Sequence, residues 1–155
     1  ESGILIATPP EAAWAKVRRL PIIAPPATRW SYNQTNYWLL GLMMARDGRW
    51  GDRQVVPKDW VAFNREPFAR YQASQDEAVP GGHWWLNRSI AGSATPWPDA
   101  PDDTFAALGH WGQAMYVIPG ENLVIVRYGD DRDGSYRHNE LLKLALKAFV
   151  AKVQP

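Results

Sequence analysis

The stretch "TFAALGHWGQAMYVIPGENLVIVRYG", residues 104–129, is the part of the sequence that decides the fold. Its second half is rich in β-branched and other apolar residues on both sides of the segment Pro-Gly-Glu-Asn at 119–122. That composition is typical of two strands joined by a turn. The stretch therefore predicts an antiparallel hairpin over residues 113–128. The preceding segment "GGHWWLN", residues 81–87, predicts one more short strand.

The segment after the hairpin, "YRHNELLKLALKAFVAKV" at 136–153, has the spacing of an amphipathic helix. Its predicted inner face consists of Leu141, Leu142, Leu144, Ala145, Ala148, Phe149 and Val153. Its predicted outer face consists of Lys143, Lys147 and Lys152. We expect Leu144 to lie in the core, so that Leu144→Ala lowers the unfolding midpoint and Lys143→Ala hardly changes it.

The first half of the chain has mainly helical patterns. Residues 35–47, "TNYWLLGLMMARD", predict a helix. Gly41 inside this helix costs roughly 1 kcal/mol against alanine, which indicates close packing against another element. Shorter helices are predicted within residues 9–20 and 56–65. Helices followed by strands and a final helix indicate an α+β fold, an antiparallel sheet with packed helices in a single domain.

The composition excludes several classes of partner and chemistry. The 17 basic and 16 acidic residues give a net charge of +1. The sequence contains no block of like charges, so it does not predict a nucleic-acid partner. The absence of cysteine excludes disulfides, thiolate metal sites and cysteine nucleophiles. No apolar run approaches the ~18 residues of a membrane span. The three histidines lack the spacing of a metal site, so we expect neither a metal nor another cofactor.

Two polar stretches could carry chemistry. The stretch "SYNQTNYWLLG", residues 31–41, holds a run of hydrogen-bonding side chains around Tyr32, and "GHWGQ", residues 109–113, follows strand-like residues. Tyr32 fits either a buried tyrosine with a bonded hydroxyl or a catalytic tyrosine held in a loop. His110 fits either a solvent-facing strand histidine or a site residue. The nine tryptophans either fill the core or line an aromatic cleft.

These stretches resemble motifs of the serine β-lactamase-like superfamily, which includes class C β-lactamases, DD-peptidases and related esterases. The triplet "YNQ" at 32–34 falls where that family has Tyr-x-Asn. The segment "HWGQ" at 110–113 falls where it has Lys-Thr-Gly or, in the esterase-like branches, His-x-Gly. The segments "ESGIL", "ARDGRWGDRQVVPKDWV" and "GGHWWLN" match others in the family's order. The resemblance implies that residues 1–155 are the C-terminal portion of a β-lactamase-like domain, with part of the β-lactamase/transpeptidase-like fold.

The resemblance also implies a reaction, acyl transfer on a small-molecule ester, amide or β-lactam. The catalytic residues that it implies are Tyr32, which would exchange a proton with the serine of a Ser-x-x-Lys motif, and His110, which would polarise Tyr32 or bind a substrate acid or ester group. The substrate-binding residues that it implies are Gln34, Trp111, Gly112 and Gln113. Gly112 would let a substrate lie against the strand, and the backbone N–H of Gln113 would form half of the oxyanion hole. A periplasmic or secreted location is implied in the same way.

The sequence departs from the family's pattern in three ways. None of the six serines is followed three places later by lysine, so the nucleophile is expected from an upstream segment, and the chain alone is expected not to acylate. Gln34 replaces an asparagine, and the missing lid region predicts a more open cleft. A second function class therefore stays open, a non-catalytic carbohydrate- or peptide-binding module with an aromatic cleft.

Overall fold

The computed structural model of the protein describes residues 4–6, 19, 21, 24–25, 28–29, 34–68, 79–89 and 94–149. The helix predicted within residues 9–20 and the candidate residue Tyr32 lie outside the described residues. The end of the last predicted helix, beyond residue 149, lies outside them as well.

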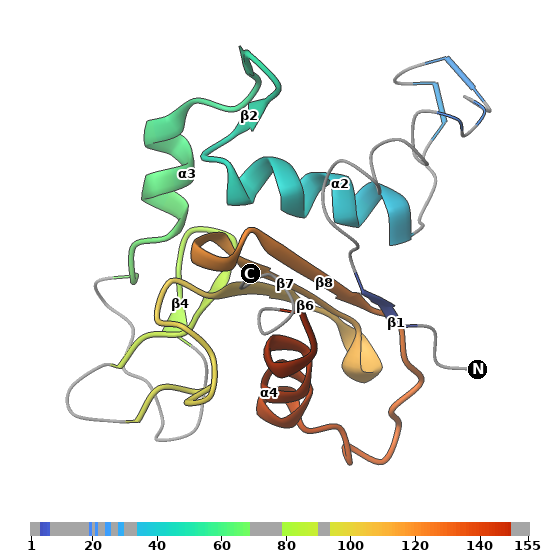
Figure 1. Ribbon diagram of the computed structural model, residues 1–155, viewed down its shortest axis with the longest axis vertical. Coiled ribbons are helices and arrows are strands. Elements are labelled where there is room, and N and C mark those ends of the chain that lie inside the picture. The colour runs from blue at the N-terminus through green and yellow to red at the C-terminus, as the bar shows by residue number, and fades with distance from the viewer. Residues whose placement is uncertain are drawn as a thin grey trace.

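A six-stranded antiparallel sheet forms the centre of the described chain (Figure 1). Its strands are β1 (Ile4–Ile6), β4 (Val79–Pro80), β5 (Trp85–Leu86), β6 (Phe105–Leu108), β7 (Ala114–Ile118) and β8 (Leu123–Arg127). They lie side by side in the order β1, β8, β7, β6, β5, β4. The predicted hairpin is confirmed: β7 and β8 pair with Tyr116 opposite Ile125, and residues 119–122 make the turn.

Residues 104–129 form three strands and not the two that the sequence predicted, because the part before the hairpin is divided. The chain makes a separate strand, β6, and then a short 3-10 turn at His110–Gly112 before β7 begins. Within that turn Trp111 and Gly112 both have positive φ, at 53° and 76°. A left-handed backbone cannot continue an extended strand, so β6 folds back and pairs antiparallel with β7.

Helices cover both faces of the sheet (Figure 1). The helices α2 (Gln34–Ala45) and α3 (Lys58–Asn64) lie on one side, and α4 (His138–Phe149) lies on the other. A two-stranded ribbon of β2 (Arg49–Trp50) and β3 (Arg53–Gln54) connects α2 to α3. The α+β prediction is therefore confirmed. None of the described helices is long and apolar enough to cross a bilayer.

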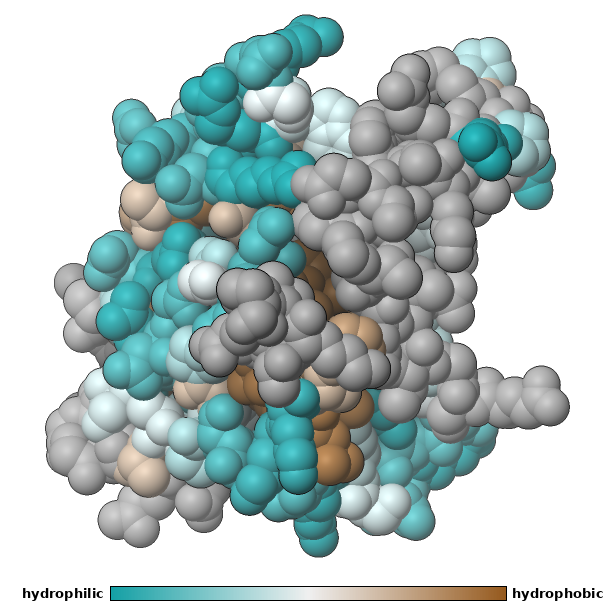
Figure 2. Space-filling view, viewed as in Figure 1, coloured by the Kyte–Doolittle hydropathy of each residue, from teal (hydrophilic) through white to brown (hydrophobic). Residues whose placement is uncertain are grey.

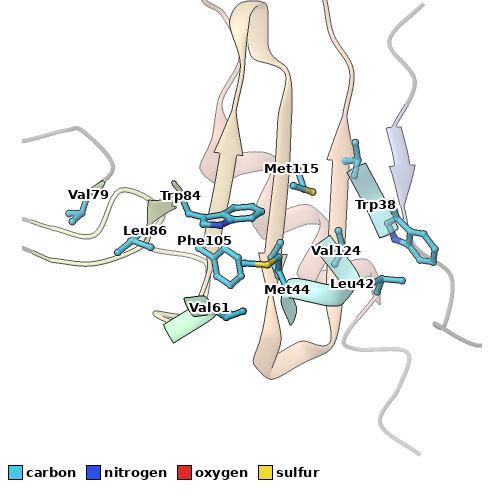
Figure 3. Close-up of a cluster of buried hydrophobic side chains, with 12 residues drawn as sticks. Trp38, Leu42, Met44, Val61, Val79, Trp84, Leu86, Phe105, Met115 and Val124 are labelled. Atoms are coloured by element: carbon cyan, nitrogen blue, oxygen red, sulfur yellow. The ribbon is translucent and has the colours of Figure 1, made fainter. Parts of the chain in front are cut away.

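The sheet separates two hydrophobic clusters. The α2-side core, drawn in Figure 3, consists of Trp38, Leu42, Met44, Val61, Val79, Trp84, Leu86, Phe105, Met115, Val117, Val124 and Val126. The α4-side core consists of Trp97, Ala100, Ala106, Ala114, Tyr116, Ile118, Leu123, Ile125, Leu142 and Ala145. Successive residues of β7 alternate between the two, as the two-residue period of a strand requires. Tryptophans thus fill the core at Trp38, Trp84 and Trp97, while Trp60, Trp85 and Trp111 are exposed.

Gly41 shows the close packing that its position inside a helix indicated. A Cβ atom at Gly41 would lie 2.6 Å from Cγ1 of Val124 and 3.1 Å from Sδ of Met115. Both partners belong to the central strands. The glycine therefore lets α2 approach the sheet, which accounts for its unfavourable helix propensity.

The prediction that Leu144 lies in the core is wrong. Leu142 is completely buried, whereas 64% of Leu144 is exposed. Residues of an α-helix are about 100° apart, so two positions two residues apart lie on nearly opposite faces. The inner face of α4 is formed by Leu142 and Ala145, with Leu141, Leu146 and Phe149 partly buried at its margins. Figure 2 accordingly shows hydrophobic surface among the hydrophilic residues at α4.

A single buried asparagine holds the loop that leads into β6. The side chain of Asn87 is inaccessible to solvent, and its Nδ2 lies 3.0 Å from the carbonyl oxygen of Trp97 and 3.1 Å from those of Ala100 and Pro101. Its Oδ1 accepts a 2.9 Å hydrogen bond from the backbone N–H of Trp97. The Trp97 ring is thereby held edge-on against Tyr116, with ring centroids 5.7 Å apart.

Candidate functional site

The segment 110–113, which the resemblance marks as a site, lies in the turn between β6 and β7 and not within a strand. Several hydrogen bonds fix it. Gly109 N–H donates to the Gln113 carbonyl at 2.8 Å, and Gln113 N–H donates to the His110 carbonyl at 3.3 Å. Asp131 N–H donates to the Trp111 carbonyl at 3.1 Å, and Gln113 Nε2 donates to the Gly129 carbonyl at 2.6 Å. The turn is therefore tied to the loop that follows β8.

The backbone N–H of Gln113, which the resemblance assigns to an oxyanion hole, already has an acceptor. Its 3.3 Å distance to the His110 oxygen is longer than the usual ~2.9–3.0 Å of an N–H to carbonyl bond. The bond closes a tight turn and is correspondingly weak. An oxyanion role for this N–H stays a prediction, and it requires the N–H to exchange this weak bond for a bond to substrate.

The structure gives a physical reason for glycine at position 112 that the sequence did not reveal. It was predicted inside a strand, leaving room for a substrate, but it sits in the turn at φ 76°. A Cβ atom there would overlap Nη1 of Arg127 and lie 3.1 Å from Cβ of Asp131. The space above Gly112 is thus occupied by the protein's own side chains. A contact between Gly112 and a substrate stays a prediction.

His110 and Trp111 are exposed on this turn. Their ring centroids lie 4.6 Å apart, and the guanidinium carbon of Arg132 lies 4.1 Å from the centroid of the Trp111 ring. Nε of Arg132 also donates to Asp130 at 2.7 Å. The turn therefore presents a ring pair with a cation stacked on it to solvent, a contact worth ~0.5–1 kcal/mol at exposed sites.

A cavity of about 150 Å³ lies beside the turn, on the α2 side of the sheet. Gln113 forms part of its wall, with Tyr37 from α2 and Tyr128 from the end of β8, and Met115 and Val126 from the strands contribute to its apolar lining. Among the described residues, Gln113 is the predicted site residue that lines this cavity. Tyr37 and Tyr128 were not among the site residues predicted from the sequence. The pairing of Ala114 with Arg127 at the open end of the hairpin places Gln113 and Tyr128 directly beyond it.

Two predicted site residues, Gln34 and Tyr32, have side chains that lie outside the described part of the chain. The backbone of Gln34 begins α2, while its side chain is not among those described. Tyr32 lies outside the described residues. The expectation that Tyr32 and His110 face one cleft therefore stays a prediction. Among the described residues, no group of three or more His, Asp or Glu side chains could hold a metal ion.

A second polar cluster lies on the α4 side of the sheet. The Tyr116 hydroxyl lies 2.8 Å from the Tyr136 hydroxyl and 2.5 Å from Nδ1 of His138, the first residue of α4. Burial raises the pKa of both tyrosine hydroxyls. Burial also lowers the pKa of His138, and the Arg127 guanidinium lowers it further, while the Asp131 carboxylate acts in the opposite direction. All three groups are therefore neutral at pH 7.

We expect this cluster to make stability depend on pH. In the unfolded chain His138 takes up its proton near pH ~6.5, and in the folded protein only at lower pH. The unfolded state therefore binds more protons in this range, and the free energy of unfolding falls as the pH drops from about 7.5 to about 5.5. One group contributes at most about 1.4 kcal/mol per pH unit.

Chemical denaturation at a series of pH values measures this slope. His138→Asn keeps an acceptor for Tyr116 but does not titrate, so it should flatten the dependence. The exposed His83, as His83→Asn, is the matched control and should leave the slope in place. An unchanged slope in His138→Asn would contradict the assignment.

Comparisons with known proteins give a partial structural likeness. No protein-family model matches the chain. No curated protein matches it either. Among solved structures, the chain is similar to a provisional 6-aminohexanoate-dimer hydrolase from Bacillus anthracis, at 14% sequence identity and a TM-score of 0.46. The match covers 77% of this chain and 27% of that protein, so the chain spans little more than a quarter of its length.

Proposed function

We propose that this chain is the substrate-binding part of a serine hydrolase of the β-lactamase, penicillin-binding protein and esterase class. It acts by acyl transfer on a small-molecule ester or amide. The observation that carries the proposal is that the "HWGQ" turn, which resembles the family's motif, borders a cavity through Gln113. Cavities with apolar linings and a few polar groups are the usual sites of small-molecule binding.

The size of the cavity narrows the kind of group that it accepts. Its volume of about 150 Å³ is half of the ~300 Å³ at which sites for drug-sized ligands begin. It therefore suits one small apolar part of a substrate, such as a short acyl chain. The reacting bond would lie outside the cavity, near His110 and Trp111 on the exposed turn. Tyr32 takes part in proton transfer in this proposal, and the nucleophile comes from a Ser-x-x-Lys segment that the 155 residues do not contain.

Nuclear magnetic resonance of the full chain, labelled with ¹⁵N, tests the proposal. We expect methyl butyrate and N-methylbutanamide to shift the side-chain resonances of Gln113 and Trp111 saturably. Ala107 lines the cavity, so Ala107→Leu should fill it and weaken binding by about tenfold or more. Ala148→Leu, on the exposed face of α4, is the matched control. If the ligands shift the resonances of Ala107→Leu as they shift those of the parent, they do not bind in the cavity.

A covalent probe completes this experiment. A fluorophosphonate is expected to leave the intact mass of the chain unchanged, because no serine has a lysine three places on. Stoichiometric labelling of a serine would show that the nucleophile has been assigned to the wrong place.

One observation favours the second function class, a carbohydrate- or peptide-binding module. Trp60 and Phe63 on α3 are 50% and 60% exposed, and their rings stack with centroids 5.6 Å apart. His83 lies beside them, 6.4 Å from Trp60. Two results together would favour this second class. An oligosaccharide would shift the Trp60 indole resonance, and the ester and amide would leave the Gln113 resonances unchanged.

A further inference from the structure

We propose that Arg127 is the positioning residue of the candidate site, because its guanidinium holds the 110–113 turn in its left-handed conformation. The inference rests on the proposed function only in treating that turn as a site. The geometry of the turn itself is independent of any ligand.

The first observation is the partner of the guanidinium. Nη1 of Arg127 donates to the carbonyl oxygen of Gly112 at 2.5 Å. The ion pairs of the described residues use other basic side chains, and none uses Arg127. A hydrogen bond from a charged donor is about twice as strong as one between neutral groups. The charge of Arg127 is therefore directed at the backbone of the turn, and no carboxylate of the described residues forms an ion pair with it.

The second observation is a pair of glycines beside the guanidinium. A Cβ atom at Gly112 would overlap Nη1 of Arg127. A Cβ atom at Gly129 would lie 2.5 Å from Cζ and 2.7 Å from Nη2. Gly129 is not among the glycines with positive φ, so its backbone would accept any residue. The position of the guanidinium thus explains why residue 129 is a glycine, since the backbone conformation there does not require one.

The third observation is what holds the guanidinium in place. Its Cζ lies 3.8 Å from the centroid of the Tyr136 ring, and the Tyr136 hydroxyl is hydrogen-bonded to the buried Tyr116. Tyr116 in turn contacts His138 at the start of α4. The guanidinium therefore connects the turn to the α4-side core. Without it, the turn would lose the charged hydrogen bond that helps to offset the left-handed backbone of Trp111 and Gly112.

Fluorine resonance spectra of the full chain, labelled with 5-fluorotryptophan, test this inference without a ligand. The Trp111 signal is identified by its loss in Trp111→Phe. We expect Arg127→Met to move or split that signal and Arg127→Lys, which keeps a charged donor, to restore it in part. Arg65 is the matched control, since its guanidinium carbon lies 5.0 Å from the Phe105 ring centroid, away from the turn. Arg65→Met should leave the Trp111 signal in place.

A double-mutant cycle separates positioning from a general loss of stability. Gly129→Ala should displace the flexible guanidinium and shift the Trp111 signal while the melting temperature stays close to that of the parent. In an Arg127→Ala background, adding Gly129→Ala should produce no further shift. Equal shifts in both backgrounds, or a parental Trp111 signal in Arg127→Met, would overturn the inference.

The outcomes for the site and for Arg127 are distinguishable. If the chain binds neither ester nor amide, the Trp111 measurements still decide the role of Arg127 in the turn. If the chain binds them and Arg127→Met leaves both binding and the Trp111 signal unchanged, the positioning role fails while the proposed function stands. Should Arg127→Met not fold, Gly129→Ala in the parent and the Lys variant still give the decisive comparison.

Discussion

Leu142→Ala should lower the free energy of unfolding by about 2–5 kcal/mol, while Leu144→Ala changes it by no more than about 0.5 kcal/mol. The two leucines lie on the same helix, two residues apart, and undergo the same substitution. Leu142 is completely buried in the α4-side core, and 64% of Leu144 is exposed. Truncating Leu142 removes buried methyl groups and leaves a cavity, whereas truncating Leu144 removes groups that water already contacts.

Urea denaturation followed by circular dichroism measures both variants on one scale. Both variants replace leucine by alanine within the same helix, so the change in helix propensity is about the same in each. The difference between their free energies of unfolding therefore measures the effect of burial. Comparable losses for both leucines would show that α4 packs on the sheet by a different face.

Asn87→Ala should lower the free energy of unfolding by about 2–5 kcal/mol, although it removes only a few atoms. The substitution leaves the Trp97 N–H and several carbonyl oxygens of the 97–101 loop without their partner in a buried place. Each buried polar group without a partner costs ~1–3 kcal/mol. Asn87→Asp should be damaging too, since a carboxylate cannot donate to the carbonyls.

Asn139 provides the matched control for Asn87. Its side chain also makes two hydrogen bonds, to the backbone N–H and the carboxylate of Asp99, but these bonds are exposed. We expect Asn139→Ala to cost about 1 kcal/mol or less. The near-ultraviolet spectrum reports on Trp97, whose ring lies against Tyr116. If Asn87→Ala keeps that spectrum and unfolds like Asn139→Ala, the loop is held by packing alone.

The sequence by itself determined the features that depend on short-range periodicity. The β-branched residues around 119–122 predict the hairpin, and apolar spacing predicts the helix α4, because each of these elements buries its own repeating face. The close approach at Gly41 was also readable, since a glycine inside a helix needs a compensating contact. The place of Leu144 was misjudged, although the rotation of about 100° per helical residue puts it opposite Leu142.

Only the tertiary structure decided the geometry of the candidate site. The "HWGQ" segment is compatible with an extended strand in sequence, and its left-handed turn depends on contacts from residues 127–131, which are distant along the chain. The same holds for the cavity, whose walls come from α2 and from the three strands β6, β7 and β8 that the sheet brings together. Local pattern predicts which face of an element is apolar. It does not predict which side chain from elsewhere in the chain fills the space above a glycine, because that is decided when the elements pack. The position of Arg127 above Gly112 and Gly129 is therefore found only in the tertiary structure.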